Sequence, residues 1–132
     1  MLITQTILKW HQFLESRDIH VLEDILDVEV VFHSPDLYSP QKGKVITTLY
    51  LIGAIEVLGK PENNFAYYHQ IQDKNIAVLE FKAEIGNIKI HGIDMIEINE
   101  VGKIINFTVM IRPLKAVHTV QEKMMELIEK MR

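Results

Sequence analysis

Residues 65–111 have the sequence FAYYHQIQDKNIAVLEFKAEIGNIKIHGIDMIEINEVGKIINFTVMI, and this stretch decides the fold. Four segments of it are rich in β-branched and aromatic residues, and short turn signals separate them, which is typical of successive antiparallel hairpins. Gly86-Asn87 suits a two-residue type II′ turn, and residues 99–102 suit a type I turn with a glycine bulge. We therefore expect four strands, over residues 65–72, 76–85, 88–98 and 104–111.

The residues before this stretch predict two helices and a strand. Residues 28–33 are rich in β-branched and aromatic side chains and predict a strand that ends at Ser34-Pro35. Asp18 is a candidate N-cap for a short helix that precedes this strand and would bury Leu26. Residues 2–17 predict an amphipathic helix because apolar residues recur there at helical spacing: Ile3, Ile7, Trp10 and Leu14.

Two further segments are predicted to be helical. Residues 44–58 have a β-branched content that suits a strand, but their length and the stop signal at residues 59–61 favour a heavily buried helix, preceded by a loop over residues 39–43. Residues 114–131 predict a final amphipathic helix. The order α-α-β-α-β-β-β-β-α, with helices segregated from a mainly antiparallel sheet, indicates the α+β class.

Composition narrows the classes of function. The 132 residues suit one domain over 1–132, and a net charge of −4 without a basic stripe argues against nucleic-acid binding. The sequence has no Cys, which excludes disulfides and thiolate chemistry. No signal peptide is evident, and the most apolar stretch, residues 45–58, is too short to span a membrane. We expect a cytoplasmic protein without a membrane partner.

Asp94 is the most informative residue for chemistry. By the two-residue period of a strand, it shares a face with an apolar row that includes Ile90, Gly92, Ile96 and Ile98. A carboxyl group there must be paired, hydrogen-bonded or protonated, and a raised pKa suits a general acid. The alternatives are a structural Asp bonded to the backbone or an Asp at a solvated strand end.

Other candidates surround this carboxyl group in the predicted sheet. His33 ends the first strand and is a candidate proton carrier near neutral pH, although a His near a strand end also suits a satisfied structural residue. His69 alternates with Tyr67 along its strand, so it could also face inward. A ligand pocket would have an apolar wall, for which the aromatic and Met side chains are candidates, although each also suits an ordinary core: Trp10, Tyr50 and Met110.

Two other chemistries are weighed against these. The six His residues show no metal-ligand spacing, so we expect no metal. Glu80 and Glu84 share a strand face and are compatible with a glycosidase pair, but a solvated or interfacial face with Lys82 between two acids is the favoured interpretation. Arg112 could anchor an anionic ligand, pair with an acid or cap the sheet edge.

Several motifs together resemble a known family. They are residues 92–96 (GIDMI), 100–104 (EVGKI) and 109–114 (VMIRPL), with residues 31–35 (VFHSP) at the front. Nearly the whole chain is similar to the bacterial polyketide-cyclase-like (SnoaL-like) branch of the nuclear transport factor 2-like superfamily. The resemblance implies a cone-shaped, strongly curved sheet wrapped by helices, a cystatin-like roll with a pocket between the layers. It also implies a homodimer through the sheet face.

The resemblance carries over to single residues. Asp94 falls where the ketosteroid isomerases of this superfamily keep a protonated Asp that donates to an oxyanion, and it also matches the pocket acid of the cyclase branch. The isomerase base corresponds to Ser34, with His33 beside it. The isomerase oxyanion Tyr falls near Trp10. Because two of the three roles are altered here, steroid isomerisation of the usual kind is not expected.

Two functions remain open at this point. The first is a pocket for a small apolar or amphipathic molecule, with isomerase, cyclase or hydratase chemistry that uses Asp94 as the acid or acid/base, His33 as its partner and no cofactor. The second is a non-catalytic dimerisation or ligand-binding module in which Asp94 is structural. The fold alone does not choose between them, because this superfamily supports many functions.

Overall fold

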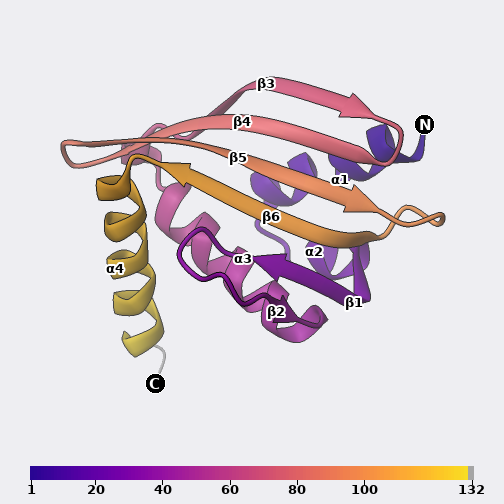
Figure 1. The fold of residues 1–132 in the computed structure, drawn as a ribbon, viewed down its shortest axis with the longest axis horizontal. Coiled ribbons are helices and arrows are strands. Elements are labelled where there is room, and N and C mark those ends of the chain that lie inside the picture. The colour runs from indigo at the N-terminus through magenta and orange to yellow at the C-terminus, as the bar shows by residue number, and fades with distance from the viewer. Residues whose placement is uncertain (131–132) are drawn as a thin grey trace.

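A computed structural model describes residues 1–130, and six strands form one curved sheet with the helices on its concave side (Figure 1). The strand order is β2-β1-β6-β5-β4-β3. All neighbouring strands are antiparallel except β1 and β6, which are parallel. The strands are β1 (Leu26–His33), β2 (Gln41–Lys42), β3 (Ala66–Asp73), β4 (Ile76–Ile85), β5 (Ile88–Ile98) and β6 (Ile104–Arg112).

The hairpins that connect β3 to β6 follow the predicted turns. Gly86 has a positive φ of +58°, and Gly102 has one of +87°, so both sit where an L-residue with a side chain would be strained. The amide of Asn99 donates to the carbonyl of Lys103, which closes the last turn. The four predicted strands are confirmed, with end positions that differ by one residue in β3 and at the end of β6.

Four α-helices and one short 3₁₀ helix complete the fold: α1 (Leu2–Ser16), α2 (Ile19–Ile25), α3 (Lys44–Leu58), η1 (Pro61–Asn63) and α4 (Leu114–Lys130). The Asp18 side chain accepts a hydrogen bond from the amide of His20 at 2.9 Å, so the predicted N-cap of α2 is confirmed. Residues 44–58 form the predicted helix rather than a strand, and α3 buries side chains on several of its sides. The α+β prediction, in the order stated, is therefore confirmed.

Two details differ from the prediction, and a third falls outside the described residues. The strand β1 begins at Leu26, because α2 ends at Ile25 and the chain turns directly into extended backbone. A two-residue strand, β2, pairs with β1 where a loop was predicted. The predicted last helix reaches Met131, which lies outside the described residues.

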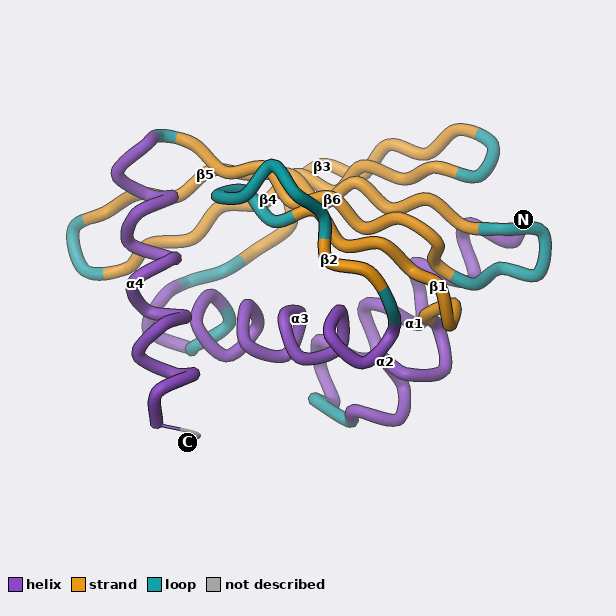
Figure 2. Tube along the Cα trace, turned by 60° about the horizontal axis from the view of Figure 1, so that its bottom comes forward, coloured by secondary structure: helices purple, strands orange, loops and turns teal. Residues whose placement is uncertain are grey.

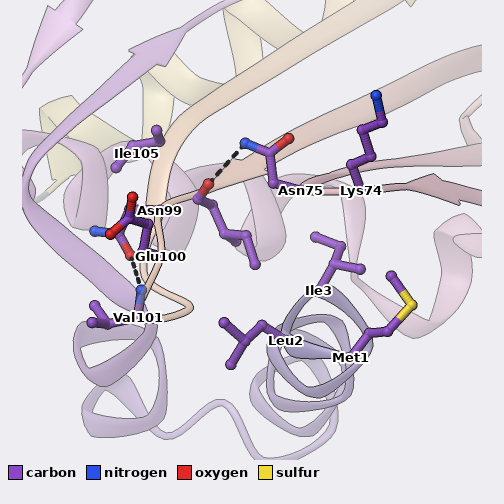
Figure 3. A pocket seen from close by; sticks show the side chains of 10 residues that line it. Met1, Leu2, Ile3, Lys74, Asn75, Asn99, Glu100, Val101 and Ile105 are labelled. Atoms are coloured by element: carbon purple, nitrogen blue, oxygen red, sulfur yellow. Dashed lines mark hydrogen bonds between the residues drawn. The ribbon is translucent and has the colours of Figure 1, made fainter.

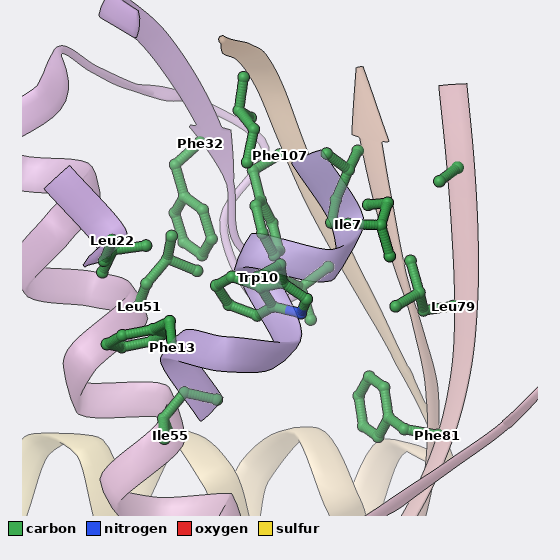
Figure 4. Close-up of a cluster of buried hydrophobic side chains, with 14 of the residues drawn as sticks. Ile7, Trp10, Phe13, Leu22, Phe32, Leu51, Ile55, Leu79, Phe81 and Phe107 are labelled. Atoms are coloured by element: carbon green, nitrogen blue, oxygen red, sulfur yellow. The ribbon is translucent and has the colours of Figure 1, made fainter. Parts of the chain in front are cut away.

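The core lies between the concave face of the sheet and helices α1 to α3, which run beneath the strands (Figure 2). Trp10 and Phe13 of α1 contact each other, and Trp10 also packs edge-on against Phe107 of β6 with ring centroids 5.0 Å apart. Phe32 of β1 and Leu51 of α3 belong to the same cluster (Figure 4). The helices thus fill most of the space that the curved sheet encloses. Within residues 1–130, no helix is long and apolar enough to cross a membrane.

Candidate functional site

Asp94 faces the interior of the protein. It lies in the middle of β5, pairs with Leu79 of β4 on one side and Val109 of β6 on the other, and is only 6% exposed. The residues that share its face are also buried: Ile90, Gly92, Ile96 and Ile98. The inward orientation that the two-residue period predicts for Asp94 is therefore what the structure has.

The Asp94 carboxylate accepts a hydrogen bond from the hydroxyl of Tyr67 on β3. The Tyr67 oxygen in turn accepts from the indole Nε1 of Trp10 at 3.0 Å. These three side chains come from α1, β3 and β5, and they form a chain of hydrogen bonds from the helix layer into the sheet. Tyr67 is therefore the hydrogen-bond partner that the buried carboxyl group of Asp94 needs.

Burial raises the pKa of Asp94 to about 7, and the hydrogen bond from Tyr67 opposes this rise. Burial, followed by the charge of Asp94, raises the pKa of Tyr67 well above its ordinary value. Asp94 is therefore largely protonated at slightly acidic pH, unlike an ordinary Asp. A neutral carboxyl group in an apolar setting can donate a hydrogen bond or a proton, and it can equally act only as a structural acceptor.

An apolar cavity of about 280 Å³ lies next to this network, between β1, β6, α3 and α4. Val109, the partner of Asp94 on β6, lines it, but Asp94 itself does not. Ser34 lines the cavity with a buried Oγ that has no hydrogen-bond partner within the described structure. Most of the remaining lining is apolar: Phe32, Pro35, Leu37, Ala54, Leu58, Ile111, Val117, Val120, Met124, Met125 and Ile128.

A second and wider concavity, of about 830 Å³, lies at the other end of the sheet around the start of α1 and two turns (Figure 3). Two of its polar side chains, Asn75 and Asn99, are used to build the turns. Asn75 donates to the carbonyl of Ile98 at 3.1 Å, and the Asn99 side chain accepts from the amides of Val101 and Lys103. The smaller apolar cavity is lined by Val109, the direct partner of Asp94 on β6, so we regard it as the candidate site.

Of the predicted wall residues, the structure brings only Tyr50 to the cavity. Tyr50 of α3 lines it and stacks on Phe32 with ring centroids 5.5 Å apart. Trp10 is 1% exposed and belongs to the core, where it reaches Asp94 only through Tyr67. Trp10 thus does not line the cavity, and its predicted place in the wall is not supported by its position.

Met110 and His33 lie on the outer face of the sheet. Met110 is 51% exposed, because its neighbours Val109 and Ile111 point into the cavity and adjacent strand residues point to opposite faces. His33 pairs with Thr108 of β6, and Thr108 pairs with Met95 of β5. All three side chains point away from the buried face, because each follows an inward-facing residue in its strand. The predicted roles of Met110 as a wall and of His33 as the partner of Asp94 are therefore not supported by their positions.

The prediction that His69 faces inward is wrong, and a β-bulge explains the error. Tyr67 pairs with Phe81, but His69 pairs with Glu80, so β3 carries one extra residue at Tyr68. A bulge of this kind shifts the alternation of every side chain that follows it. His69 consequently lies on the outer face and contacts the Glu80 carboxylate at 2.8 Å.

Glu80 is the centre of a polar cluster on this outer face. Its carboxylate accepts from the Tyr68 hydroxyl at 2.6 Å and from His91 Nε2 at 2.5 Å, besides its contact with His69. These hydrogen bonds, the one from Tyr68 first, lower the pKa of Glu80 to about 2, and the same contact raises the pKa of Tyr68 to about 12. Glu80 is thus committed to local partners, which agrees with a solvated face rather than a glycosidase pair.

The residue that sequence reasoning undervalued is Tyr67. In the sequence it stands out only as a residue that alternates with His69 along a strand, and nothing there pairs it with Asp94, which lies 27 positions away. From the sequence, Ser34 is only the residue at which a strand ends and the counterpart of the isomerase base, and its place in the cavity comes from the structure. No sequence signal identifies Asp36 or Gln121 as cavity residues.

Comparisons with solved structures place this geometry among known proteins. The chain is 30% identical to a steroid delta-isomerase from Pseudomonas aeruginosa, with a TM-score of 0.90 over 98% of this chain and 93% of that one. An uncharacterised protein with a cystatin-like fold from Silicibacter pomeroyi is 25% identical, with a TM-score of 0.84 over 94% of this chain and 85% of that one.

A nuclear transport factor 2-like protein of unknown function from Mesorhizobium loti shares the fold at 11% identity, with a TM-score of 0.71 over 85% of this chain and 92% of that one. The chain belongs to the nuclear transport factor 2-like superfamily. No family model and no curated protein matches its sequence. Membership of the nuclear transport factor 2-like superfamily accounts for the curved sheet and its helices, but the site must be interpreted from its own residues.

Proposed function

We propose that this protein binds a small, largely apolar molecule in the cavity between β6, α3 and α4. The observation that carries the proposal is an apolar cavity of about 280 Å³ with one buried, unpartnered hydroxyl at Ser34. An apolar wall with a few polar groups is what small-molecule sites in proteins have in common. A ligand would gain from burying its apolar surface and from supplying the partner that Ser34 lacks.

The similarity to a steroid delta-isomerase supports an apolar ligand and suggests proton-transfer chemistry as a second step. In that proposal Asp94 is the acid, because its raised pKa suits proton transfer near neutral pH and needs no cofactor. The geometry favours binding over catalysis for two reasons. Asp94 does not line the cavity, because Val109 of the neighbouring strand lies between them, and the Asp94 carboxylate already accepts a hydrogen bond from Tyr67. We also propose that the protein is cytoplasmic, because a sequence without Cys suits a reducing compartment.

The Ala54→Trp variant tests the binding site. Ala54 lines the cavity from α3, so a large side chain there occupies the space that a ligand would need. We expect binding of the neutral dye Nile red, followed by its fluorescence, to weaken by at least about tenfold. Leu49→Trp is the matched control, because Leu49 is 56% exposed on the same helix and does not line the cavity. Equal dye binding by both variants would refute the proposed site.

We also propose that two copies of the chain associate through the outer face of the sheet. This face carries exposed apolar side chains among its charges, including Ile71 at 68% and Met110 at 51%. Such residues are common in the centre of a dimer interface.

Met110→Asp tests the dimer, because it places a charge in the middle of that face. Sedimentation velocity should find a dimer for the wild type and a dissociation constant raised at least about tenfold for the variant. Leu37→Asp is the control, since Leu37 lies in the loop at the cavity and away from the sheet face. A monomeric wild type at micromolar concentration would contradict the association.

A further inference from the structure

The polar groups of the apolar cavity are few, and they differ in how far they are satisfied. Four of the residues that line it carry polar side chains: Ser34, Asp36, Tyr50 and Gln121. The Asp36 carboxylate accepts a hydrogen bond from Gln121 Nε2 at 3.1 Å, which ties the loop after β1 to α4. Ser34 Oγ, in contrast, is buried and has no hydrogen-bond partner within residues 1–130. Among the lining residues, Ser34 thus carries a buried hydroxyl that has no hydrogen-bond partner in the described structure.

The described lining of the cavity carries one acidic side chain and no basic one. None of the residues that line the cavity in the described part of the chain is Lys, Arg or His, and the one ionisable acid among them is Asp36. Asp36 is exposed, so its carboxylate lies at the solvent side of the cavity. A ligand carboxylate that entered would lose its hydration, meet no cation and pass a like charge.

We infer that the cavity selects neutral molecules with a single carbonyl or hydroxyl group and rejects carboxylates, with Ser34 as the anchor and Asp36 as the residue that repels anions. This inference rests on the proposed function, because it specifies the ligand of the same site. Ser34 can donate to a ligand carbonyl or accept from a ligand hydroxyl. An unpartnered buried hydroxyl discriminates strongly, since a ligand without a matching group leaves it unsatisfied.

Three probes that share one ring system test the inference: 2-acetylnaphthalene, 2-naphthoate and naphthalene. Their affinities are measured at pH 8 by displacement of Nile red from the full chain. We expect 2-acetylnaphthalene to bind about tenfold more tightly than naphthalene, a factor that corresponds to about 1.4 kcal/mol. We expect 2-naphthoate to bind at least about a hundredfold more weakly than the ketone, because the charge must be desolvated without a partner.

Variants assign these preferences to residues. Ser34→Ala should make the ketone and naphthalene bind equally, whereas Tyr50→Phe, which removes the other hydroxyl of the lining, should leave the preference intact. Asp36→Asn keeps an acceptor for Gln121 and should strengthen 2-naphthoate binding about threefold at low salt, with no effect on the ketone. Thermal melts of each variant establish that it folds.

The outcomes separate the inference from the proposed function. If no probe and no dye binds the wild type, the proposed function fails. If the dye and naphthalene bind but 2-naphthoate binds as tightly as the ketone, the cavity is a binding site and the inference about charge is wrong. Loss of the ketone preference in Tyr50→Phe rather than in Ser34→Ala would overturn the assignment of the anchor.

Discussion

The wild-type protein should become less stable as the pH rises from about 4 to about 7, and the Asp94→Asn variant should not show this decrease. The pKa of Asp94 is raised from 3.8 to about 7 in the folded protein. Between these values the folded state keeps a proton that the unfolded state has released, so the free energy of unfolding decreases with rising pH and levels off above pH 7. At 1.36 kcal/mol per pKa unit, the whole decrease is at most about 4 kcal/mol.

Asn cannot ionise, and its carbonyl can still accept the hydrogen bond from Tyr67. The variant should therefore match the wild type only below about pH 4, be somewhat more stable than it at pH 5 and exceed it most at pH 8. Urea unfolding of both proteins at pH 5, 6, 7 and 8 measures this difference. Glu80, whose pKa is lowered to about 2, contributes stability that is lost as the pH falls below about 4.5, and this contribution is the same in both proteins and cancels in their difference.

Tyr67→Phe is the control that links the effect to the hydrogen-bond chain. Because the Tyr67 hydroxyl lowers the pKa of Asp94, its removal should raise that pKa and extend the decrease in stability to higher pH. Trp10 also loses the acceptor of its indole N–H, which should lower stability at all pH values. An identical pH dependence in wild type and Asp94→Asn would show that Asp94 titrates as an ordinary Asp and would remove the main argument for its acid role.

The Gly92→Ala variant should be destabilised by about 3 kcal/mol or should fail to fold. A Cβ atom at position 92 would lie 2.5 Å from the carbonyl oxygen of Met110 and 2.5 Å from Cζ of Phe81. The first is backbone of the neighbouring strand, and the second belongs to a ring that is 1% exposed, so neither can move cheaply. Added atoms in a tightly packed interior cost about 1–3 kcal/mol and sometimes more.

Gly53→Ala is the matched control for this substitution. A Cβ atom there would meet the flexible end of Met124, at 3.2 Å from its Cε, and Gly53 lies inside α3, where Ala is favoured by about 1 kcal/mol. We expect its unfolding free energy to equal or exceed that of the wild type. Urea unfolding monitored by far-ultraviolet circular dichroism measures both variants, and a Gly92→Ala protein of wild-type stability would mean that β5 and β6 are less tightly packed than the structure indicates.

Together, these results would separate two properties of the same interior. Asp94 and Tyr67 form a satisfied polar network that tunes a pKa, whereas the cavity lined by Ser34 and Tyr50 is where a ligand would bind. A change in pH dependence without a change in dye binding would support a structural Asp94. A ligand that alters the pKa of Asp94 would instead couple the two and favour proton-transfer chemistry.

Much of the fold could be predicted from local patterns in the sequence. The alternation of β5 shows that Asp94 shares the buried face, because successive strand residues must point to opposite sides. The length of residues 44–58 and the stop signal after Leu58 favour a helix over a strand, because both are properties of adjacent residues. The hairpin turns follow from Gly86 and Gly102 for the same reason.

Only the tertiary structure decided which residues make the site. The bulge at Tyr68 turned His69 outward, because one extra residue in β3 depends on pairing with β4 rather than on the residue types of β3 alone. Tyr67 is 27 positions from Asp94 and 57 positions from Trp10 in the sequence, so no local pattern predicts its hydrogen bonds with them. The cavity likewise joins β1, α3, β6 and α4, and its shape depends on how four distant segments pack together.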